Sequence, residues 1–418
     1  MSQNSHPSPE SSQDPERHAA AAEKQPGRPD ARAEAKSRNQ AEPIDLSEYI
    51  PSVSRAEDTA ELRFEPLTES NAAAVNDLFQ GVFGVERPLE HHRWKFFGNP
   101  EGPGIACVAI ERSSGSVVGV NAGLNWRFWT AGREVRFLQT CETAIAPRFR
   151  GLRLYRQITG DLAWQAVDRG MVLAYGGRIN PAALRLGERY FSFRQLFELA
   201  TWERRLSLRL ALGNRIGRSG ALTARAIGLI RRPKPAPEED RYQFKRVDTF
   251  DSTFDQLWER YRDGYAVIRV RDAAALNHRY RDCPVGEHRV WLALLNGEAR
   301  GYVVTRLWEH GGARLATVLD WLDGGDPELL MGLYSRALRD AAMSGCDFFR
   351  VAPVPGSSAH TAVSALAGFV PSTREPVDRV VTCLLPLDDP RAPEHAFLVP
   401  TLDPSAWHYT QGDSDFHD

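Results

Sequence analysis

The sequence predicts an α/β protein with two related domains, each a mixed twisted sheet flanked by helices, after a disordered N-terminal tail. Three observations predict this class. Strand-like apolar runs alternate with stretches at helical spacing, the order of these elements recurs at an offset of roughly 175 to 185 residues, and the first residues are almost free of large apolar side chains. The expected segments are a disordered tail, a first domain, a basic linker or helix, a second domain and an acidic tail, at residues 1–58, 59–207, 208–240, 241–388 and 389–418.

Composition narrows the class of protein before any motif is considered. The chain has 418 residues and a formal net charge of −2, so bulk electrostatics do not favour nucleic acid as a partner. Its five cysteines are scattered and never spaced as C-x-x-C, which argues against a disulfide framework or a zinc site and fits a reducing compartment. No apolar run is long enough to span a bilayer, so we expect a cytoplasmic protein that binds no metal.

The first domain begins with clear strand and helix patterns. Residues 61–65 alternate as in a strand, and Asn71 to Phe83 carries apolar residues at helical spacing. A turn at 113–115 separates two apolar runs, which predicts a hairpin. The strands expected in this region cover 104–111, 116–124, 126–130 and 135–145.

The most informative stretch covers residues 138–193. A strand-like run ends at Pro147, an Arg-rich turn with Gly151 follows, and an amphipathic helix comes next. A second strand and the dipeptide Asn180-Pro181, which predicts another helix start, complete the stretch. Backbone N–H groups in the first turn of a helix bind anions, so this strand–turn–helix unit predicts a phosphate-sized site.

The second half of the sequence repeats the element order of the first. The motif at 94–100 (WKFFGNP) returns at 278–284 (HRYRDCP), and each copy is followed by a strand, a glycine turn and a second strand. Three aspartates between Leu319 and Asp326 take the place of the Arg-rich turn. Because carboxylates repel pyrophosphate and cap helices, we expect this copy to cap a helix near Pro327 and to bind no phosphate.

The stretch at 138–193 resembles the acyl-CoA-binding core of the GNAT superfamily of N-acyltransferases. That family carries P-x-Y-R-G-x-G-L-x at the strand-to-helix turn, and this chain has P-R-F-R-G-L-R-L-Y from Pro147 to Tyr155. Asn180 stands where the family's pantetheine-contacting Asn lies, and Phe193 matches the Phe of the family's L-G-F motif. The resemblance implies two tandem GNAT-like domains, the second of them degenerate.

The resemblance also implies acetyl-CoA or another acyl-CoA as co-substrate. The pantetheine arm would run along the strand Thr140 to Ala146, and the phosphates would lie at the helix N-terminus with arginine donors beside them. Arg153 replaces the second glycine of the family motif, and its side chain would either crowd or clamp the pyrophosphate. The implied cofactor-binding residues are Ala144, Ile145, Arg148, Arg150, Gly151, Leu152, Arg153 and Asn180.

Two residues are candidates for moving protons. Glu142 lies in the mostly apolar strand before the turn, where burial would raise the pKa of its carboxyl and make it a base toward an amine; an edge-strand Glu facing solvent is the alternative. The family often places a Tyr before its L-G-F motif as the acid for the leaving thiolate. This chain has Glu188 at that position, so Tyr190, slightly further along, becomes the candidate acid.

Three other features have simpler interpretations. His91-His92 lacks a third nearby ligand and is expected to be solvated or to line a cleft. The group Ser357, Ser358 and His360 lacks the turn of a nucleophile elbow, so we expect a helix cap there. The Arg-rich segment 204–234 contains no acidic residue, and it is either a helix with a solvated basic face or a surface for anionic lipid or glycan.

Together these features predict an N-acyltransferase that moves an acyl group from CoA to an amine of a small molecule or a glycan, in cell-envelope or polysaccharide synthesis. The protein would be cytoplasmic or peripheral to a membrane. One alternative is a Fem-type aminoacyl transferase, which uses aminoacyl-tRNA and which the near-neutral charge disfavours. The other is a non-catalytic binding protein, with its donor site closed by Arg153 and its basic segment on a membrane.

Overall fold

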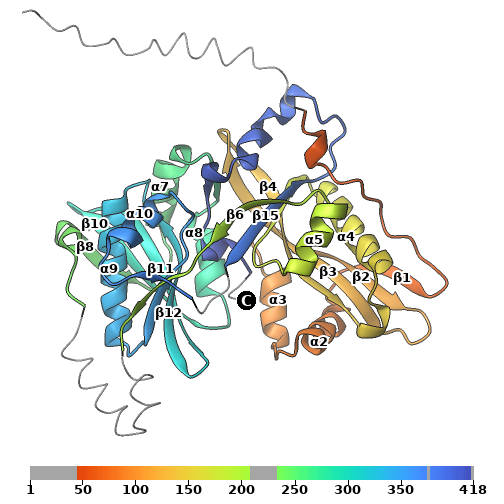
Figure 1. The fold of residues 1–418 in the computed structure, drawn as a ribbon, viewed down its shortest axis with the longest axis horizontal. Coiled ribbons are helices and arrows are strands. Elements are labelled where there is room, and N and C mark those ends of the chain that lie inside the picture. Colours follow the sequence, from red (N-terminus) through yellow and green to blue (C-terminus); the bar gives the residue numbers. More distant parts are fainter. Residues whose placement is uncertain (1–44, 208–232, 374–376, 416–418) are drawn as a thin grey trace, which may run out of the picture. The chain divides into compact units, whose positions relative to one another are not determined.

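The protein contains two mixed sheets flanked by helices (Figure 1). The structure, a computed structural model, describes residues 45–207, 233–373 and 377–415, all within one compact unit. This architecture confirms the predicted fold class. The helices are α2 (Ala72–Phe83), α3 (Leu89–Phe97), α4 (Leu152–Val167), α5 (Pro181–Tyr190), α7 (Ser252–Tyr261), α8 (Ala273–Leu276), α9 (Pro327–Met343) and α10 (Ser358–Ala365).

The first sheet has the strand order β1-β2-β3-β4-β5-β15-β6, and β9 and β16 extend it beside β3. The β4–β5 pair is parallel, whereas β15 runs antiparallel to both of its neighbours. One long strand, β3, replaces the two strands predicted at 116–124 and 126–130. The strands are β1 (Leu62–Pro66), β2 (Ile105–Glu111), β3 (Val117–Thr130), β4 (Arg133–Ile145), β5 (Met171–Gly176), β6 (Arg194–Leu199), β9 (Val267–Arg269), β15 (Asp378–Leu384) and β16 (Trp407–His408).

The second sheet has the order β14-β7-β13-β12-β11-β10-β8. Its central β12–β13 pair is parallel, as β4–β5 is in the first sheet. The strands are β7 (Trp202–Arg205), β8 (Gln243–Val247), β10 (Glu287–Leu295), β11 (Glu298–His310), β12 (Ala313–Leu322), β13 (Phe348–Val351) and β14 (Val370–Pro371).

The two sheets exchange strands. We call residues 59–207 the N-terminal half and residues 241–388 the C-terminal half, after the predicted domains. Strand β15 comes from the C-terminal half and lies between β5 and β6 of the first sheet. Strand β7 comes from the N-terminal half and lies between β13 and β14 of the second sheet. The sheets therefore cross the predicted domain boundaries.

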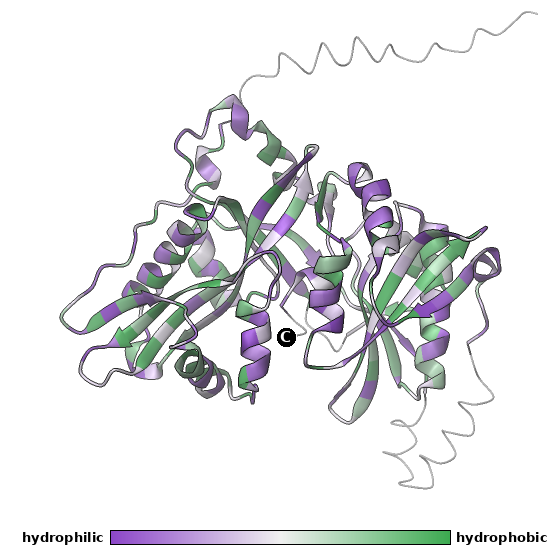
Figure 2. Ribbon diagram, turned by 180° about the vertical axis from the view of Figure 1, so that it is seen from behind, coloured by the Kyte–Doolittle hydropathy of each residue, from purple (hydrophilic) through white to green (hydrophobic). Residues whose placement is uncertain are grey.

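Helices cover both faces of the first sheet. Helix α4 packs against β2, β3 and β5, and it buries Ile158, Leu162 and Ala166 along one side. Helix α2 packs against β3 and β4 together with α3. Side chains alternate along β4 except at a bulge, where Cys141 and Glu142 both lie opposite Ala122 of β3. Figure 2 shows hydrophobic residues along the strands of both sheets.

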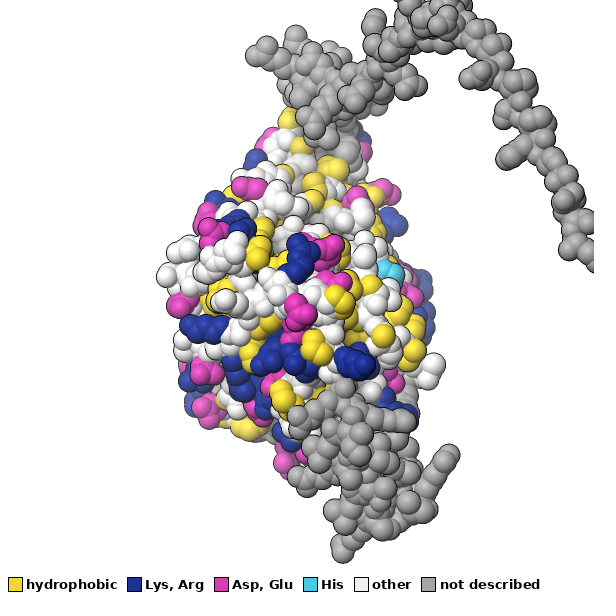
Figure 3. Space-filling model, turned by 90° about the vertical axis from the view of Figure 1, so that its left-hand side faces the viewer, with side chains coloured by type: hydrophobic (Ala, Val, Ile, Leu, Met, Phe, Trp, Pro, Cys, Tyr) yellow, Lys and Arg dark blue, Asp and Glu magenta, His cyan; other side chains and the backbone are white. Residues whose placement is uncertain are grey.

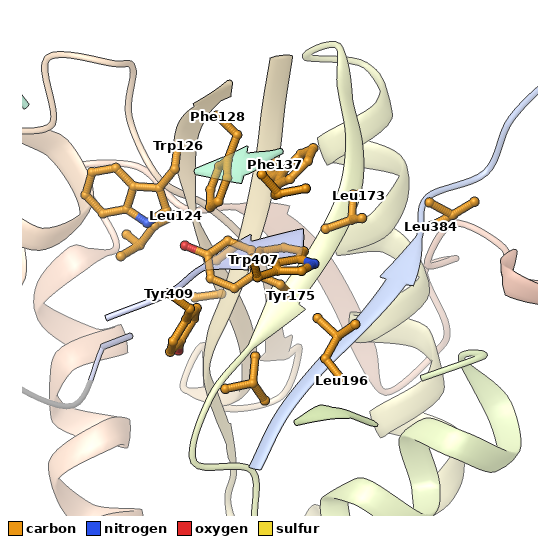
Figure 4. Close-up of a cluster of buried hydrophobic side chains, with 14 of the residues drawn as sticks. Leu124, Trp126, Phe128, Phe137, Leu173, Tyr175, Leu196, Leu384, Trp407 and Tyr409 are labelled. Carbon is orange, nitrogen blue, oxygen red and sulfur yellow. The ribbon is translucent and has the colours of Figure 1, made fainter. Parts of the chain in front are cut away.

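The C-terminal segment belongs to the core, which corrects the predicted acidic tail. Trp407 is 3% exposed and lies against Phe128, Phe137 and Tyr175, with ring centroids 5.8 to 6.1 Å away. Figure 4 shows this aromatic group between strands of the first sheet. The residues that follow, 411–414, are also buried. Asp413 pairs here with the buried Arg269 and Arg271 from a distant segment, which no local pattern indicates.

The described part of the N-terminal tail is ordered, which corrects the predicted disorder for residues 45–58. Leu46 is 2% exposed, and the carbonyl oxygen of Val53 accepts a hydrogen bond from Trp164 Nε1 at 3.1 Å. A Cβ on Gly160 of α4 would lie 2.4 Å from the carbonyl oxygen of Ser54, so only glycine permits this close packing. Residues 1–44 lie outside the described residues.

Most of the Arg-rich segment 204–234 also lies outside the described residues. Its first residues, Arg204 and Arg205, belong to strand β7 and not to a basic helix. On the face shown in Figure 3, cationic side chains lie among acidic and apolar ones and form no uniform patch. Within 45–207, 233–373 and 377–415, no helix is long and apolar enough to cross a membrane.

Candidate functional site

Strands β4 and β5 separate at their carboxyl ends. Their parallel pairing runs from Arg136 and Met171 to Gln139 and Tyr175 and then stops. The Thr140 hydroxyl donates to the Tyr175 carbonyl oxygen at 3.2 Å at this branch point. Beyond it, β4 pairs only with β3, so the other edge of residues 141–145 has no strand partner among the described residues. Unpaired backbone groups on such an edge can pair with an extended ligand.

The branch leads to the N-terminus of α4. A short 3₁₀ turn, Pro147–Phe149, follows β4, and Gly151 stands at the N-cap without a side chain to cap the helix. Its backbone is extended, with φ 173° and ψ 159°, and an added Cβ would meet no atom within 4 Å. The helix therefore starts without a side-chain cap, and a side chain added at Gly151 would extend into open space. This is the arrangement that binds phosphate groups.

The predicted arginine donors lie around this turn. Arg148 pairs with Glu111, and Arg150 Nε donates to the carbonyl oxygen of Ile145 at 3.3 Å. Arg153 is exposed and lines a cavity of about 360 Å³ together with Arg156 of α4. The other lining residues are Ser52, Val53, Ser54, Leu152, Gln157 and Phe191. The ordered N-terminal segment thus forms one wall of a cationic cavity beside the helix start.

The remaining implied donor-site residues lie along the strand and the next helix. Ala144 is buried opposite Val120, whereas Leu152, the first residue of α4, is 38% exposed. Asn180 is the N-cap of α5, and its side-chain oxygen accepts from the backbone N–H groups of Ala182 and Ala183 at 3.0 and 2.8 Å. That oxygen stabilises the helix start, a second task that the sequence pattern did not indicate.

Tyr190, the candidate acid, lies at the end of α5. Its ring is 5.5 Å from the guanidinium of Arg156 and 5.2 Å from that of Arg189. Phe193, which matches the family motif, packs where a Cβ on Gly187 would come within 2.2 Å of its ring. Sequence reasoning missed Tyr155, which lies on α4 with its ring 5.5 Å from Phe191 and whose pKa burial raises.

Glu142, the candidate base, is buried in a group of charged and polar side chains. We call Asn76, Arg87, His92, Lys95 and Glu142 the N-terminal carboxylate cluster. Arg87 and Lys95 both contact Oε1 of Glu142, the latter at 3.0 Å. The other oxygen, Oε2, is buried and has no hydrogen-bond partner among the described residues. Glu142 therefore faces α2 and α3, neither solvent nor a purely apolar core.

The environment of Glu142 corrects the predicted pKa. Burial acts to raise the pKa of its carboxyl, but the charges of Lys95 and Arg87 outweigh burial and lower it. The expected rise was wrong because both cations come from α3 and the segment before it, far from Glu142 in sequence.

His92 lies in the same cluster and is buried, whereas the sequence favoured a histidine pair that is solvated or lines a cleft. Its Nδ1 lies 2.9 Å from an Arg87 nitrogen, and since guanidinium groups only donate, Nδ1 accepts and Nε2 carries the proton. That Nε2 has no hydrogen-bond partner among the described residues. Burial and the charge of Arg87 lower the pKa of His92 to about 4. The described residues contain no group of His, Cys, Asp and Glu that fits a metal ion.

The C-terminal half contains a matching cluster. Arg271 precedes His278 by the same interval by which Arg87 precedes Trp94, and Trp94 stacks on His278 at 5.2 Å. Arg271 Nε contacts Asp320 on β12 at 2.8 Å, as Arg87 contacts Glu142 on β4. We call Arg271, Tyr280, Asp320 and Asp413 the C-terminal carboxylate cluster.

The helix that follows β12 is capped, as predicted. Asp326 is the N-cap of α9 and accepts from the backbone N–H groups of Glu328 and Leu329 at 2.9 and 3.2 Å. At the start of α9 the backbone N–H groups are thus bound by a carboxylate, whereas the start of α4 has no side-chain cap. Ser357 likewise caps α10 by accepting from the backbone N–H of His360 at 3.2 Å, which confirms the expected cap.

Comparisons with known proteins identify the fold. No family model matches this sequence, and no curated protein sequence matches it. The structure is similar to Saccharomyces cerevisiae N-myristoyltransferase with bound myristoyl-CoA, with a TM-score of 0.54 and 10% identity over 80% of this chain and 85% of that one. It is also similar to a GCN5-related N-acetyltransferase from Anabaena variabilis, with a TM-score of 0.55 and 14% identity over 78% of this chain and 73% of that one.

A third similar structure is the GCN5-related N-acetyltransferase from Kribbella flavida, with a TM-score of 0.52 and 15% identity over 78% of this chain and 71% of that one. At these identities the likeness concerns the fold. The described residues of this chain therefore have the fold of GNAT N-acyltransferases, as the turn from Pro147 to Tyr155 predicted.

Proposed function

We propose that the protein is an N-acyltransferase that moves an acyl group from acyl-CoA to an amine. One observation carries this proposal: the separated ends of β4 and β5 lead directly to the uncapped N-terminus of α4. The extended pantetheine arm of CoA fits the separated strand ends, and the pyrophosphate at the end of that arm fits the helix N-terminus. The fold shared with a myristoyl-CoA complex supports the same placement of the donor.

Each predicted donor residue has a distinct task in this proposal. The N–H groups at Gly151 and Leu152 bind the pyrophosphate, and Arg150 and Arg153 donate to its oxygens. The open edge of β4, including Ala144 and Ile145, pairs with the pantetheine amides. The exposed Arg153 lines the adjacent cavity, which supports a clamp and not a block.

Acyl transfer then requires a path for protons. The amine nitrogen attacks the thioester carbon, the C–N bond forms, the C–S bond breaks, and the amine proton must leave while the thiolate is neutralised. We assign the first task to Glu142 and the second to Tyr190. At neutral pH the lowered pKa keeps Glu142 ionised, so its carboxylate is in the form that can accept the proton that the amine loses.

The acceptor in this proposal is an amine on a small molecule or a cell-envelope glycan. The carboxylate of Glu142 has one buried oxygen without a partner among the described residues, and an amine is a donor that fits it. The predicted membrane contact through 204–234 stays a prediction because residues 208–232 lie outside the described residues.

Thermal unfolding with acyl-CoA tests the donor site. Acetyl-, octanoyl- and myristoyl-CoA are added in turn to the wild type and to the variant Arg150→Ala/Gly151→Asp. We expect at least one acyl-CoA to raise the Tm of the wild type and none to raise that of the variant. No shift in the wild type with any of them would overturn the proposal, and turnover only with aminoacyl-tRNA would favour a Fem-type transferase.

A further inference from the structure

The C-terminal half supplies an edge of the donor site through strand exchange. Strand β15 pairs with β5 from Leu384 opposite Leu173 to Val381 opposite Gly176. Its first residue, Asp378, extends beyond the end of β5 and reaches the loop that follows. We call residues 177–180 the β5–α5 loop. This loop lies next to the place where β4 and β5 separate, and it ends at Asn180, the cap of α5.

Asp378 holds the backbone of this loop. Its Oδ1 accepts a hydrogen bond from the backbone N–H of Arg178. The Asp378 side chain comes from a strand on the opposite side of β5 from β4, and the residue is 8% exposed. Burial is the main cause that raises the pKa of Asp378 to about 6, and the charge of Asp415 acts in the same direction. The hydrogen bond from the Arg178 N–H and the charge of Arg178 act to lower this pKa. Burying a carboxylate is costly unless it accepts hydrogen bonds, and the backbone N–H of Arg178 is such a donor here.

The loop conformation needs such a restraint. Arg178 has φ 54°, in the left-handed region, where a residue other than glycine is disfavoured by on the order of 1 kcal/mol. A Cβ on the preceding Gly177 would lie 2.8 Å from the Tyr409 hydroxyl and 3.7 Å from Asp378 Oδ2. Strand β15 and the C-terminal segment therefore both pack against the loop at Gly177.

From this geometry we propose that Asp378 is a positioning residue of the donor site, through which the C-terminal half sets the conformation of the β5–α5 loop and so the affinity for acyl-CoA. The inference rests on the proposed function for its ligand. In this proposal the C-terminal half takes a direct part in donor binding, although its described helices α7, α8, α9 and α10 all start with a side-chain cap. Asp378 acts through the Arg178 N–H and touches no reacting atom.

Steady-state kinetics of three variants test this role. Asp378→Ala removes the acceptor, and we expect KM for acyl-CoA to rise about tenfold with little change in kcat, the size of a lost hydrogen bond to a charged group. Asp378→Asn keeps an oxygen that accepts from the Arg178 N–H and should restore most of the affinity.

Arg379→Ala serves as the matched control on the same strand. Its guanidinium pairs with Glu198 on the exposed side of β15, so its loss should leave KM unchanged. If Asp378→Ala and Asp378→Asn raise KM equally, or if Arg379→Ala has the same effect, the positioning role is wrong.

Hydrogen exchange separates this inference from the proposed function. In the absence of acyl-CoA, amide exchange in residues 177–180 should be faster in Asp378→Ala than in the wild type and near normal in Asp378→Asn. Unchanged exchange in Asp378→Ala overturns the positioning role, whatever the ligand is. Faster exchange in a protein whose wild type binds no acyl-CoA overturns the proposed function and, with it, the donor-site part of the inference.

Discussion

The two halves of the molecule carry the same buried Arg–carboxylate pair but leave its carboxylate in different states. In the C-terminal half, Asp320 accepts from Arg271, from the Tyr280 hydroxyl at 2.7 Å and from the backbone N–H of Trp321 at 2.8 Å. In the N-terminal half, both cations contact one oxygen of Glu142, and Oε2 has no partner among the described residues. The buried pair alone is thus part of the architecture, and the two halves differ in the number of hydrogen-bond donors that their paired carboxylate accepts from.

The helix starts of the two halves differ in the same sense. Asp326 uses the first N–H groups of α9, whereas α4 starts at Gly151 with no side-chain cap. A carboxylate at a helix N-terminus stabilises the helix and excludes phosphate from it. In the C-terminal half the cap therefore stabilises the helix start. In the N-terminal half the equivalent backbone N–H groups have no side-chain cap and can bind a ligand.

The largest effect should come from removing the two carboxylates in turn. Glu142→Gln leaves Arg87 buried with only neutral partners, Asn76 and His92, and should cost about 3–5 kcal/mol of the free energy of unfolding. Asp320→Asn should cost less, because Arg271 keeps Asp413 at 2.7 Å. Urea denaturation of both variants measures the difference.

Acyl-transfer activity gives a second comparison of Glu142→Gln and Asp320→Asn. Measured where both remain folded, acyl transfer should fall in Glu142→Gln alone, while both bind acyl-CoA as the wild type does. An equal loss of turnover in the two variants would show that Glu142 has only the structural task of its counterpart.

The next effect concerns His92, whose counterpart in the C-terminal half is Leu276. The folded pKa of His92 is lowered to about 4, so between pH 6.5 and 4 the unfolded chain binds a proton that the folded chain does not. Stability from this group is present above pH 6.5 and is lost as the pH falls, by about 3 kcal/mol at pH 4.

His92→Leu should therefore flatten the dependence of the unfolding free energy on pH over this range. Urea midpoints at pH 7 and pH 4.5, for wild type and variant, give the two slopes. Equal slopes would mean that His92 is protonated in the folded protein or is accessible to solvent.

The smallest effect on the unfolding free energy should come from removing the cap of α9 and adding one to α4. Asp326→Ala removes the cap of α9 and should cost about 1 kcal/mol. Gly151→Asp adds a cap to α4 at an extended residue with free space around it and should stabilise the protein slightly. Both changes are measured by urea denaturation. A marked destabilisation by Gly151→Asp would contradict the open space at that residue.

Local patterns were enough to predict the secondary structure around the proposed donor site. The Arg-Gly turn, the helix after it and the start of α5 at Asn180-Pro181 depend on neighbouring residues, and the structure contains each of them. The aspartate cap of α9 was predictable for the same reason. Such features need only short-range spacing and residue type.

Long-range features were out of reach of the sequence. The insertion of β15 between β5 and β6 pairs residues far apart in the chain, and no local pattern indicates which sheet a strand joins. The pKa of Glu142 was predicted with the wrong sign because its strand suggested apolar surroundings, whereas distant residues supply Arg87 and Lys95. Trp407 and Asp413 likewise have partners that only the folded chain brings near.

The number of acyl-CoA molecules bound per chain tests the central claim most directly. Calorimetric titration of the wild type should give one site, because among the described helices only α4 starts without a side-chain cap directly after a strand branch. Gly151→Asp should lose that site while remaining folded, and Asp326→Ser, which keeps a cap in the C-terminal half, should retain it. Two sites in the wild type, or one site that survives Gly151→Asp, would contradict a single donor site at the N-terminus of α4.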